Sequence, residues 1–124
     1  MVAALGPNVW VRNPLLAQEI SVPRDSFLGR LSRSLELFPD LHMQIGAIFA
    51  AGDPVAVEEV ETATLTLTGR RYELPVACFF RIGADGLIAE VHNYWDSACH
   101  FSQLGIERDK LAELLGAPDA KIGR

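Results

Sequence analysis

The stretch Gly86-Leu-Ile-Ala-Glu-Val-His-Asn-Tyr-Trp-Asp96 decides the fold, together with the run from Tyr72 to Ile82 before it. Asp85-Gly86 between them is typical of a tight hairpin turn, so the two runs are predicted to be adjacent antiparallel strands. Alternation along the later strand gives one row that holds Leu87, Ala89, Val91, Asn93 and Trp95. A buried amide in such a row costs about 1–3 kcal/mol unless it is hydrogen-bonded. The pattern therefore predicts a binding pocket around Asn93.

The strand predicted from Val55 to Leu67 places two glutamates, Glu59 and Glu61, in its more apolar row. Burial would raise the pKa of either carboxyl group, and a raised pKa suits a general acid or base near neutral pH. Alternatively, both glutamates lie at the rim of the sheet and stay hydrated. The inward row of the next strand is almost entirely apolar and consists of Tyr72, Leu74, Val76, Cys78, Phe80 and Ile82.

These rows define a candidate site. Glu61 and Asn93 are its candidate catalytic residues. The candidate ligand-binding residues are Trp10, Phe38, Glu59, Leu74, Val76, Cys78, Phe80, Val91 and Trp95. The aromatic members of this set are explained equally well as ordinary core, and Cys78 has only apolar neighbours, which favours a packing role over a nucleophilic one.

Other chemistries find little support in the sequence. His92, Asp96, Cys99 and His100 are metal-type ligands, but their spacing fits no metal signature, so no metal site is predicted. Glycine-rich nucleotide-binding motifs and a nucleophilic serine elbow are absent, and we expect no cofactor.

Composition narrows the class of protein. A chain of 124 residues with ordinary hydrophobicity predicts a single domain over residues 1–124. The net charge of −5 predicts no nucleic-acid partner, and the lack of a long apolar run predicts no membrane span. Two cysteines without redox or metal spacing favour reduced thiols and a cytoplasmic location. The arginines Arg24, Arg30 and Arg33 are expected on a solvated face.

The order of elements predicts an α+β protein. Met1 to Pro7 is expected to form no element, and a short strand covers Asn8 to Asn13. A helix from about Pro23 to Phe38 leads into a strand from Leu41 to Ala50 and then into the strands described above. Two short helices follow, at residues 97–104 and 107–115, with Gly105 and Gly116 as end caps. A curved antiparallel sheet is expected to wrap one face around helices.

Several stretches resemble the SnoaL-like branch of the nuclear transport factor 2-like (NTF2-like) superfamily, which includes polyketide cyclases, ketosteroid isomerases and limonene-1,2-epoxide hydrolases. They are Val9-Trp-Val-Arg-Asn-Pro14, Leu37-Phe-Pro-Asp-Leu-His42, Thr68-Gly-Arg-Arg-Tyr-Glu-Leu-Pro75, Phe80-Arg-Ile, and Asp85 to Asp96. The resemblance covers about residues 8–105 and implies a cone, a strongly curved mixed or antiparallel sheet packed around helices. It also implies an apolar pocket and a homodimer formed through the sheet.

The chain departs from this family in three places. Asn93 stands where family enzymes often have a carboxylate, and an amide cannot transfer a proton. Glu59 and Glu61 match an arginine and an aspartate of the epoxide hydrolases, so the acid–arginine–acid arrangement for epoxide opening is missing. The long opening helix of the family is not supplied by Met1 to Pro7, so a partner chain or the C-terminal segment is expected to fill its place, unless the chain is a shortened form.

Three functions therefore stay open. The first is a pocket that binds a small apolar molecule, oriented by Glu61 and Asn93. The second is an isomerase or cyclase that uses Glu61 as general acid or base, with Asn93, helped by Trp10 or Tyr72, bonded to the oxygen that gains charge. The third is a non-catalytic interaction module with a vestigial pocket.

Overall fold

The computed structural model describes residues 4–16, 18–50, 52–115 and 121–122. In chain order its elements are β1 (Leu5–Arg12), β2 (Ile20–Pro23), α1 (Arg24–Leu37), β3 (His42–Ala50), β4 (Pro54–Thr64), β5 (Arg71–Ile82), β6 (Ile88–Tyr94), α2 (Ser97–Leu104), α3 (Arg108–Leu115) and β7 (Lys121–Ile122). The strands form one sheet in the order β3-β4-β5-β6-β1-β2-β7. Because β1 pairs with β6 in parallel and the other pairs are antiparallel, the sheet is mixed.

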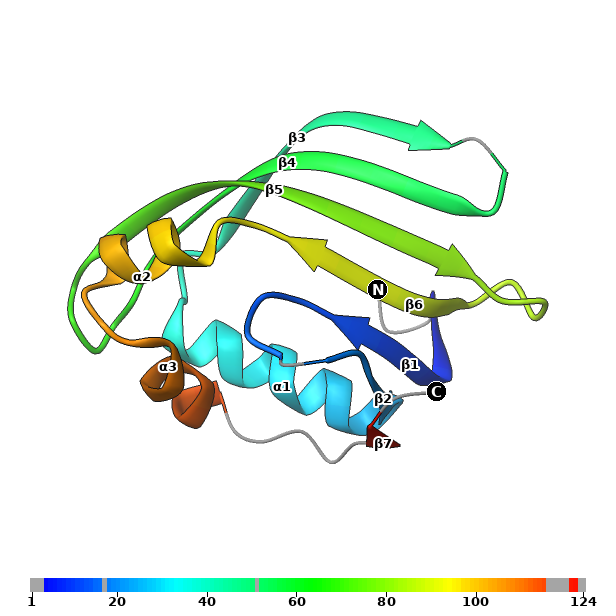
Figure 1. The fold of residues 1–124 in the computed structure, drawn as a ribbon, viewed down its shortest axis with the longest axis horizontal. Coiled ribbons are helices and arrows are strands. Elements are labelled where there is room, and N and C mark those ends of the chain that lie inside the picture. Colours follow the sequence, from blue (N-terminus) through cyan, green and yellow to red (C-terminus); the bar gives the residue numbers. More distant parts are fainter. Residues whose placement is uncertain (1–3, 17, 51, 116–120, 123–124) are drawn as a thin grey trace.

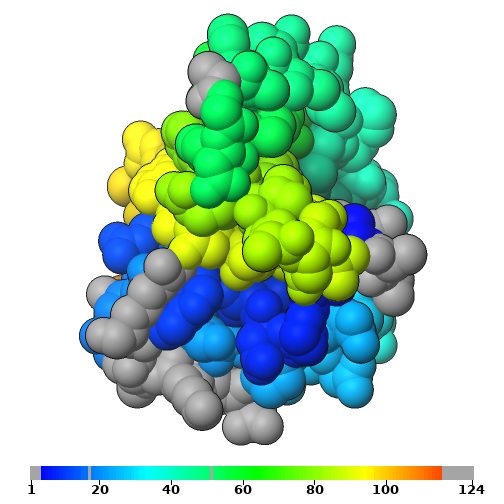
Figure 2. All heavy atoms as spheres, turned by 90° about the vertical axis from the view of Figure 1, so that its right-hand side faces the viewer, coloured from blue at the N-terminus to red at the C-terminus, as the bar shows by residue number. Residues whose placement is uncertain are grey.

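The sheet curves over α1, and the two C-terminal helices lie together at one end of the molecule (Figure 1). Viewed from the other end, the β3–β4 hairpin forms the top of the surface, and the turn between β5 and β6 lies below it (Figure 2). Two buried clusters fill the interior, one under β4 and β5 and one under β1, β2 and β6, and Phe80 packs against both. Among the described residues no helix combines the length and apolar character that a membrane crossing requires.

The predicted hairpin between β5 and β6 is confirmed. Gly86 has a φ of 78°, a left-handed conformation that glycine adopts without strain. The two strands are antiparallel and place Cys78 opposite Asn93. The register between β5 and β6 shifts next to Ile82. As a result Ile88 packs on the core, whereas the predicted inward row had placed Leu87 there.

The predicted helix is also confirmed, with Pro23 just before its first residue. Its end is fixed by Asp40, whose two carboxylate oxygens accept bonds of 2.7 Å from the backbone N–H and the hydroxyl of Thr64. These bonds lower the pKa of Asp40. The end of α1 is therefore tied to the end of β4. Gly105 caps α2 with a φ of 70°, as predicted, and the predicted cap Gly116 lies outside the described residues.

Two expectations for the N-terminal part were wrong. The segment before Asn8 is not free of structure, because β1 begins at Leu5, and this side chain is only 1% exposed. The strand β2 was not predicted, since its four residues are too few to show a period. Pairing of β1 with both β2 and β6 buries Val9 and Val11, so these strands are stabilised by their place in the sheet.

Candidate functional site

A cavity of about 210 Å³ lies between the inner face of the sheet, α1 and the C-terminal helices. Its wall is mostly apolar, and α3 contributes Leu111 and Leu115 to it. The last described helix, α3, therefore closes part of the cavity. The polar or charged side chains in the wall include Arg30, Glu61, Tyr72, Asn93, Trp95 and His100. A mostly apolar hollow with a few converging polar groups is the usual form of a small-molecule site.

Glu61 and Tyr72 form the central polar pair of this wall. They lie on neighbouring strands, β4 and β5, and the Tyr72 hydroxyl donates a hydrogen bond of 2.8 Å to Oε2 of Glu61. Burial raises the pKa of Glu61, the bond from Tyr72 lowers it, and the nearby Glu59 carboxylate raises it, with a net increase. Burial and the Glu61 carboxylate also raise the pKa of Tyr72, so its hydroxyl keeps its proton. Glu61 is thus held in place, and its raised pKa is the direction that favours a general acid or base.

Asn93 lies on β6 and lines the cavity, and its side-chain oxygen is hydrogen-bonded to Cys78. The thiol of Cys78 lies 2.7 Å from Oδ1 of Asn93 and 3.5 Å from Oε1 of Glu59. Burial, together with the Glu59 carboxylate, raises the pKa of Cys78 to about 12, so this sulfur is a thiol and a donor. With its oxygen occupied by the thiol, Asn93 has its NH₂ group available to donate to a ligand.

His100 and Trp95 carry the unsatisfied polar atoms of the site. Among the described residues, Nε1 of Trp95 and both ring nitrogens of His100 are buried without a hydrogen-bond partner. Burial lowers the pKa of His100 to about 4, so the imidazole is neutral at pH 7, with one donor and one acceptor nitrogen. The His100 ring packs against Tyr72, with 4.6 Å between ring centroids, and its edge lies against Trp95 at 5.8 Å. These three nitrogens are shielded from any group of the size of a water molecule, so they do not face open space in the cavity.

The structure separates the predicted site residues into three groups. Glu61, Asn93, Phe38 and Trp95 line the cavity. The next group lies on the inner face of the sheet but outside the cavity wall, and its members are Glu59, Leu74, Val76, Cys78, Phe80 and Val91. Glu59 is only 7% exposed, so the hydrated-rim alternative does not hold for this residue.

Trp10 forms the third group, and its assignment to the pocket was wrong. In β1 it pairs with Glu90 of β6 and with Ser21 of β2, whereas its neighbour Val11 lines the cavity. Because side chains alternate along a strand, Trp10 lies on the outer face of the sheet.

The residues of the cavity wall that were not predicted include His100 and Arg30. His100 was considered only as a metal ligand, and Arg30 was expected on a solvated face. Arg30 instead lines the cavity and is half-buried. Both lie on helices, in α1 and α2, where the inward face depends on how the helix packs. Within the described ranges no group of three or more His, Cys, Asp and Glu side chains is placed to hold a metal ion.

Comparison with protein families gives one match. The model of the SnoaL-like domain matches residues 1–91. Comparison with curated protein sequences gives no match.

Solved structures with the same fold cover most of the chain. The chain is 25% identical to IdmH of Streptomyces antibioticus, a candidate polyketide cyclase, with a TM-score of 0.67 and 84% of each chain covered. An NTF2-like protein of Burkholderia thailandensis is 22% identical, with a TM-score of 0.72 and coverage of 86% of this chain and 83% of that one. An LEH-like epoxide hydrolase of M. tuberculosis is also 22% identical, with a TM-score of 0.67 and coverage of 94% and 81%. These similarities confirm the predicted α+β cone.

Proposed function

Because the chain belongs to the SnoaL-like domain family, we propose that its cavity binds a small, largely apolar molecule with a polar group. The observation that carries this proposal is the mostly apolar cavity of about 210 Å³ whose wall brings together the polar side chains of Glu61, Tyr72 and Asn93.

The hydrogen-bonding groups define the polar part of the ligand. Asn93 offers its NH₂ group, and Glu61 offers its carboxyl group. A carbonyl or hydroxyl oxygen bound here would accept from Asn93, and a hydroxyl would also donate to Glu61. The apolar wall would cover the rest of the molecule.

Binding can be tested with the neutral fluorescent probe N-phenyl-1-naphthylamine and a variant that fills the cavity. Leu31 lines the cavity, whereas Leu35, one turn later in α1, is exposed and lies outside the wall. We expect Leu31→Trp to weaken probe binding about tenfold or more, and Leu35→Trp to leave it unchanged. Circular dichroism checks that both variants are folded. The proposal would be contradicted if the wild-type protein did not bind the probe, or if the two variants bound it equally well.

A second candidate function is acid/base catalysis on a substrate with an enolisable carbonyl group. The observation that favours it is the raised pKa of Glu61 together with the bond from Tyr72 that orients its carboxyl group. In this mechanism the Glu61 carboxylate removes a proton from the carbon next to the carbonyl and returns it to another carbon. Asn93, through its NH₂ group, would stabilise the oxygen that gains negative charge. Tyr72 would act through Glu61, since its hydroxyl is already committed to that carboxylate.

Proton exchange tests this candidate without knowledge of the natural substrate. The loss of the α-proton signal of 2-tetralone in D₂O, followed by NMR, measures proton removal directly. Glu61→Gln keeps the shape but cannot accept the proton, and we expect it to slow protein-catalysed exchange about 10²–10⁴-fold. The matched control is Glu58→Gln, because Glu58 lies on the same strand and is exposed. The catalytic candidate would be rejected if exchange were no faster with the protein than without it, or if Glu61→Gln did not slow it. The binding function would then be the one that remains.

A further inference from the structure

The three arginines of α1 differ in what they contact. Arg24 donates to the carbonyl of Leu5 at 3.3 Å. Arg33 donates to the carbonyl of Leu114 and to Glu36, both at 2.9 Å. Arg30 lines the cavity, and among the described residues it has neither a hydrogen bond nor an ion pair. It is thus a cavity-lining arginine whose guanidinium has no partner among the described residues.

The described residues around Arg30 supply no opposite charge. Burial lowers the pKa of Arg30, and no carboxylate in the described part of the chain offsets that effect. The groups that shift the pKa of Glu61 are Tyr72 and Glu59, so Glu61 is not the partner of this arginine. The half-buried Arg30 therefore loses part of its water without gaining a charged partner among the described residues, and an anion bound beside it would supply one.

We propose that the ligand of this cavity carries an anionic oxygen group, of the carboxylate or sulfonate class, that binds to the guanidinium of Arg30. The inference rests on the proposed binding function and adds the class of ligand. A planar guanidinium with free donors can bind such a group through two parallel hydrogen bonds. An ionised Glu61 would repel the anionic group, so the ligand places this group at Arg30 and its neutral polar group near Asn93. The ligand is then a small organic acid with an apolar body.

A pair of probes isolates the anionic group. 1-Anilinonaphthalene-8-sulfonate has the framework of N-phenyl-1-naphthylamine with one added sulfonate. We expect the wild-type protein to bind the sulfonate about tenfold more tightly than the neutral probe, and we expect salt to weaken this preference. Arg30→Gln should abolish the preference for the sulfonate over the neutral probe. Arg33→Gln is the matched control, because it removes the same charge from the same helix outside the cavity wall, and it should keep the preference.

The outcomes separate the inference from the function on which it rests. If neither probe binds, the proposed binding function fails and the inference fails with it. If the neutral probe binds and the sulfonate binds no better, the function stands and the inference is overturned. A preference that survives Arg30→Gln, or that Arg33→Gln reduces equally, also overturns it, because surface charge would then explain the binding. Should Arg30→Gln be unfolded, Arg30→Lys keeps the charge but lacks the planar pair of donors, and a reduced preference in that variant supports the inference.

Discussion

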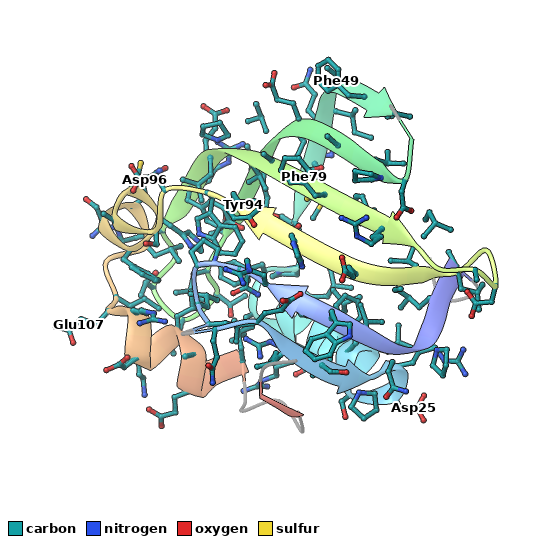
Figure 3. All side chains as sticks on the ribbon, turned by 45° about the vertical axis from the view of Figure 1, so that its right-hand side comes forward. Asp25, Phe49, Phe79, Tyr94, Asp96 and Glu107 are labelled. Atoms are coloured by element: carbon teal, nitrogen blue, oxygen red, sulfur yellow. The ribbon has the colours of Figure 1, made fainter. Side chains whose placement is uncertain are left out.

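The two faces of strands β3 to β6 each depart at particular residues from the usual pattern of a sheet. The inner face carries polar side chains among apolar ones, and Glu59 on it is 7% exposed. One residue later, Val60 on the outer face is 37% exposed, and Phe79 and Tyr94 are 40% and 47% exposed. Phe79 and Tyr94 pack edge to face with 5.8 Å between ring centroids, and Phe49 lies on the same face at the edge of the sheet (Figure 3). Antiparallel sheets with one solvated face normally place their polar residues outside.

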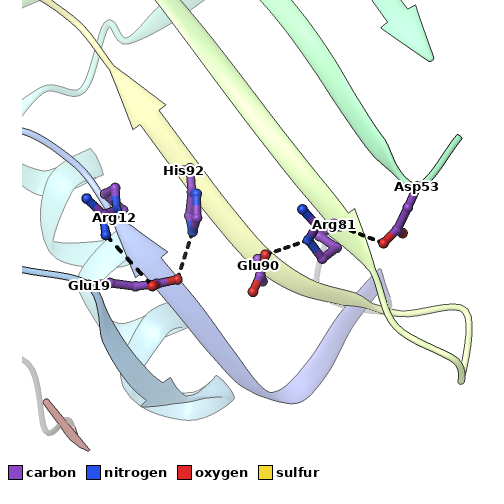
Figure 4. A network of polar contacts seen from close by, with 6 residues as sticks. All are labelled: Arg12, Glu19, Asp53, Arg81, Glu90 and His92. Carbon is purple, nitrogen blue, oxygen red and sulfur yellow. Dashed lines mark hydrogen bonds and ion pairs between the residues drawn. The ribbon is translucent and has the colours of Figure 1, made fainter. Parts of the chain in front are cut away.

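The outer face is not apolar throughout. Toward β6 and β1 it is covered by ion pairs (Figure 4). Glu19 contacts His92 at 2.9 Å and Arg12 at 3.9 Å, and Arg81 bridges Glu90 at 2.8 Å and Asp53 at 2.7 Å. The apolar patch, defined by Phe49, Val60, Phe79 and Tyr94, is therefore bordered by charge on one side.

The comparison teaches that neither face is arranged for the stability of an isolated chain. Buried polar groups on the inner face reduce stability unless they are bonded, and exposed aromatic rings on the outer face gain little from folding. Both departures are understandable if each face contacts something else. The inner face would contact a ligand, and the outer face a second protein surface.

The largest effect expected from this comparison is on the free energy of unfolding. Leu74 on the inner face is 1% exposed and pairs with Glu61 across the strands, so Leu74→Ala should lower stability by about 2–5 kcal/mol. Val60→Ala, on the outer face of the neighbouring strand, should cost less than about 1 kcal/mol. Urea unfolding of both variants measures the two values. Equal losses of the free energy of unfolding in the two variants would show that the two faces contribute alike to stability and would contradict this prediction.

The next effect is a dependence of stability on pH that comes from His100. Its pKa is 6.5 in the reference state and about 4 in the folded protein, where burial disfavours the charged ring. Between these values the unfolded chain binds a proton that the folded protein does not bind, so stability falls as the pH drops through this window. The gap corresponds to a loss of up to about 3 kcal/mol.

The matched variant for this effect is His100→Phe, which keeps an aromatic ring and removes the titration. We expect wild type to lose up to about 3 kcal/mol relative to this variant between pH 7 and pH 4, measured by urea unfolding at each pH. The raised pKa of Glu61 acts in the opposite direction, because its penalty for ionisation disappears at low pH, and it is present in both proteins. A difference that does not change with pH would mean that His100 is not buried as a neutral ring.

The sequence was sufficient for the elements that local chemistry determines. Asp85-Gly86 predicts the hairpin because glycine accepts its positive φ, and Pro23 marks the helix start because its ring suits the first turn. It was insufficient at Leu5-Gly-Pro7, where glycine and proline argue against a strand but parallel pairing with β6 forms one. Pairing between distant segments cannot be inferred from the local pattern.

The same division applies to the site. Glu61 and Asn93 were found because a polar residue in an apolar strand row is visible in the sequence. His100 could have been found from its helical spacing to Leu104, since residues four apart share a face and both are buried. Trp10 could have been rejected because Val9 and Val11 on either side of it form the apolar row. Arg30 could be placed only by the packing of α1 against the sheet, because charge on a helix usually faces water.

The last and smallest expected effect concerns the outer face, where we predict that two copies of the chain pair through the apolar patch. Light scattering should then give twice the chain mass of 13.6 kDa. Phe79→Asp, which places a charge in the patch, should weaken association by about 2 kcal/mol or more and yield monomers at low concentration. Leu35→Asp is the control, since this side chain is 53% exposed on α1, away from the sheet.

If the wild-type protein is a monomer, or if both variants dissociate equally, the prediction that a second copy covers the outer face is wrong. Binding of N-phenyl-1-naphthylamine by the Phe79→Asp protein then decides whether the faces are independent. Phe79 points away from the cavity wall, so we expect the affinity for the probe to stay within about twofold of wild type. A monomeric variant that lost the probe would show that association shapes the cavity, and the two faces would have to be treated as one site.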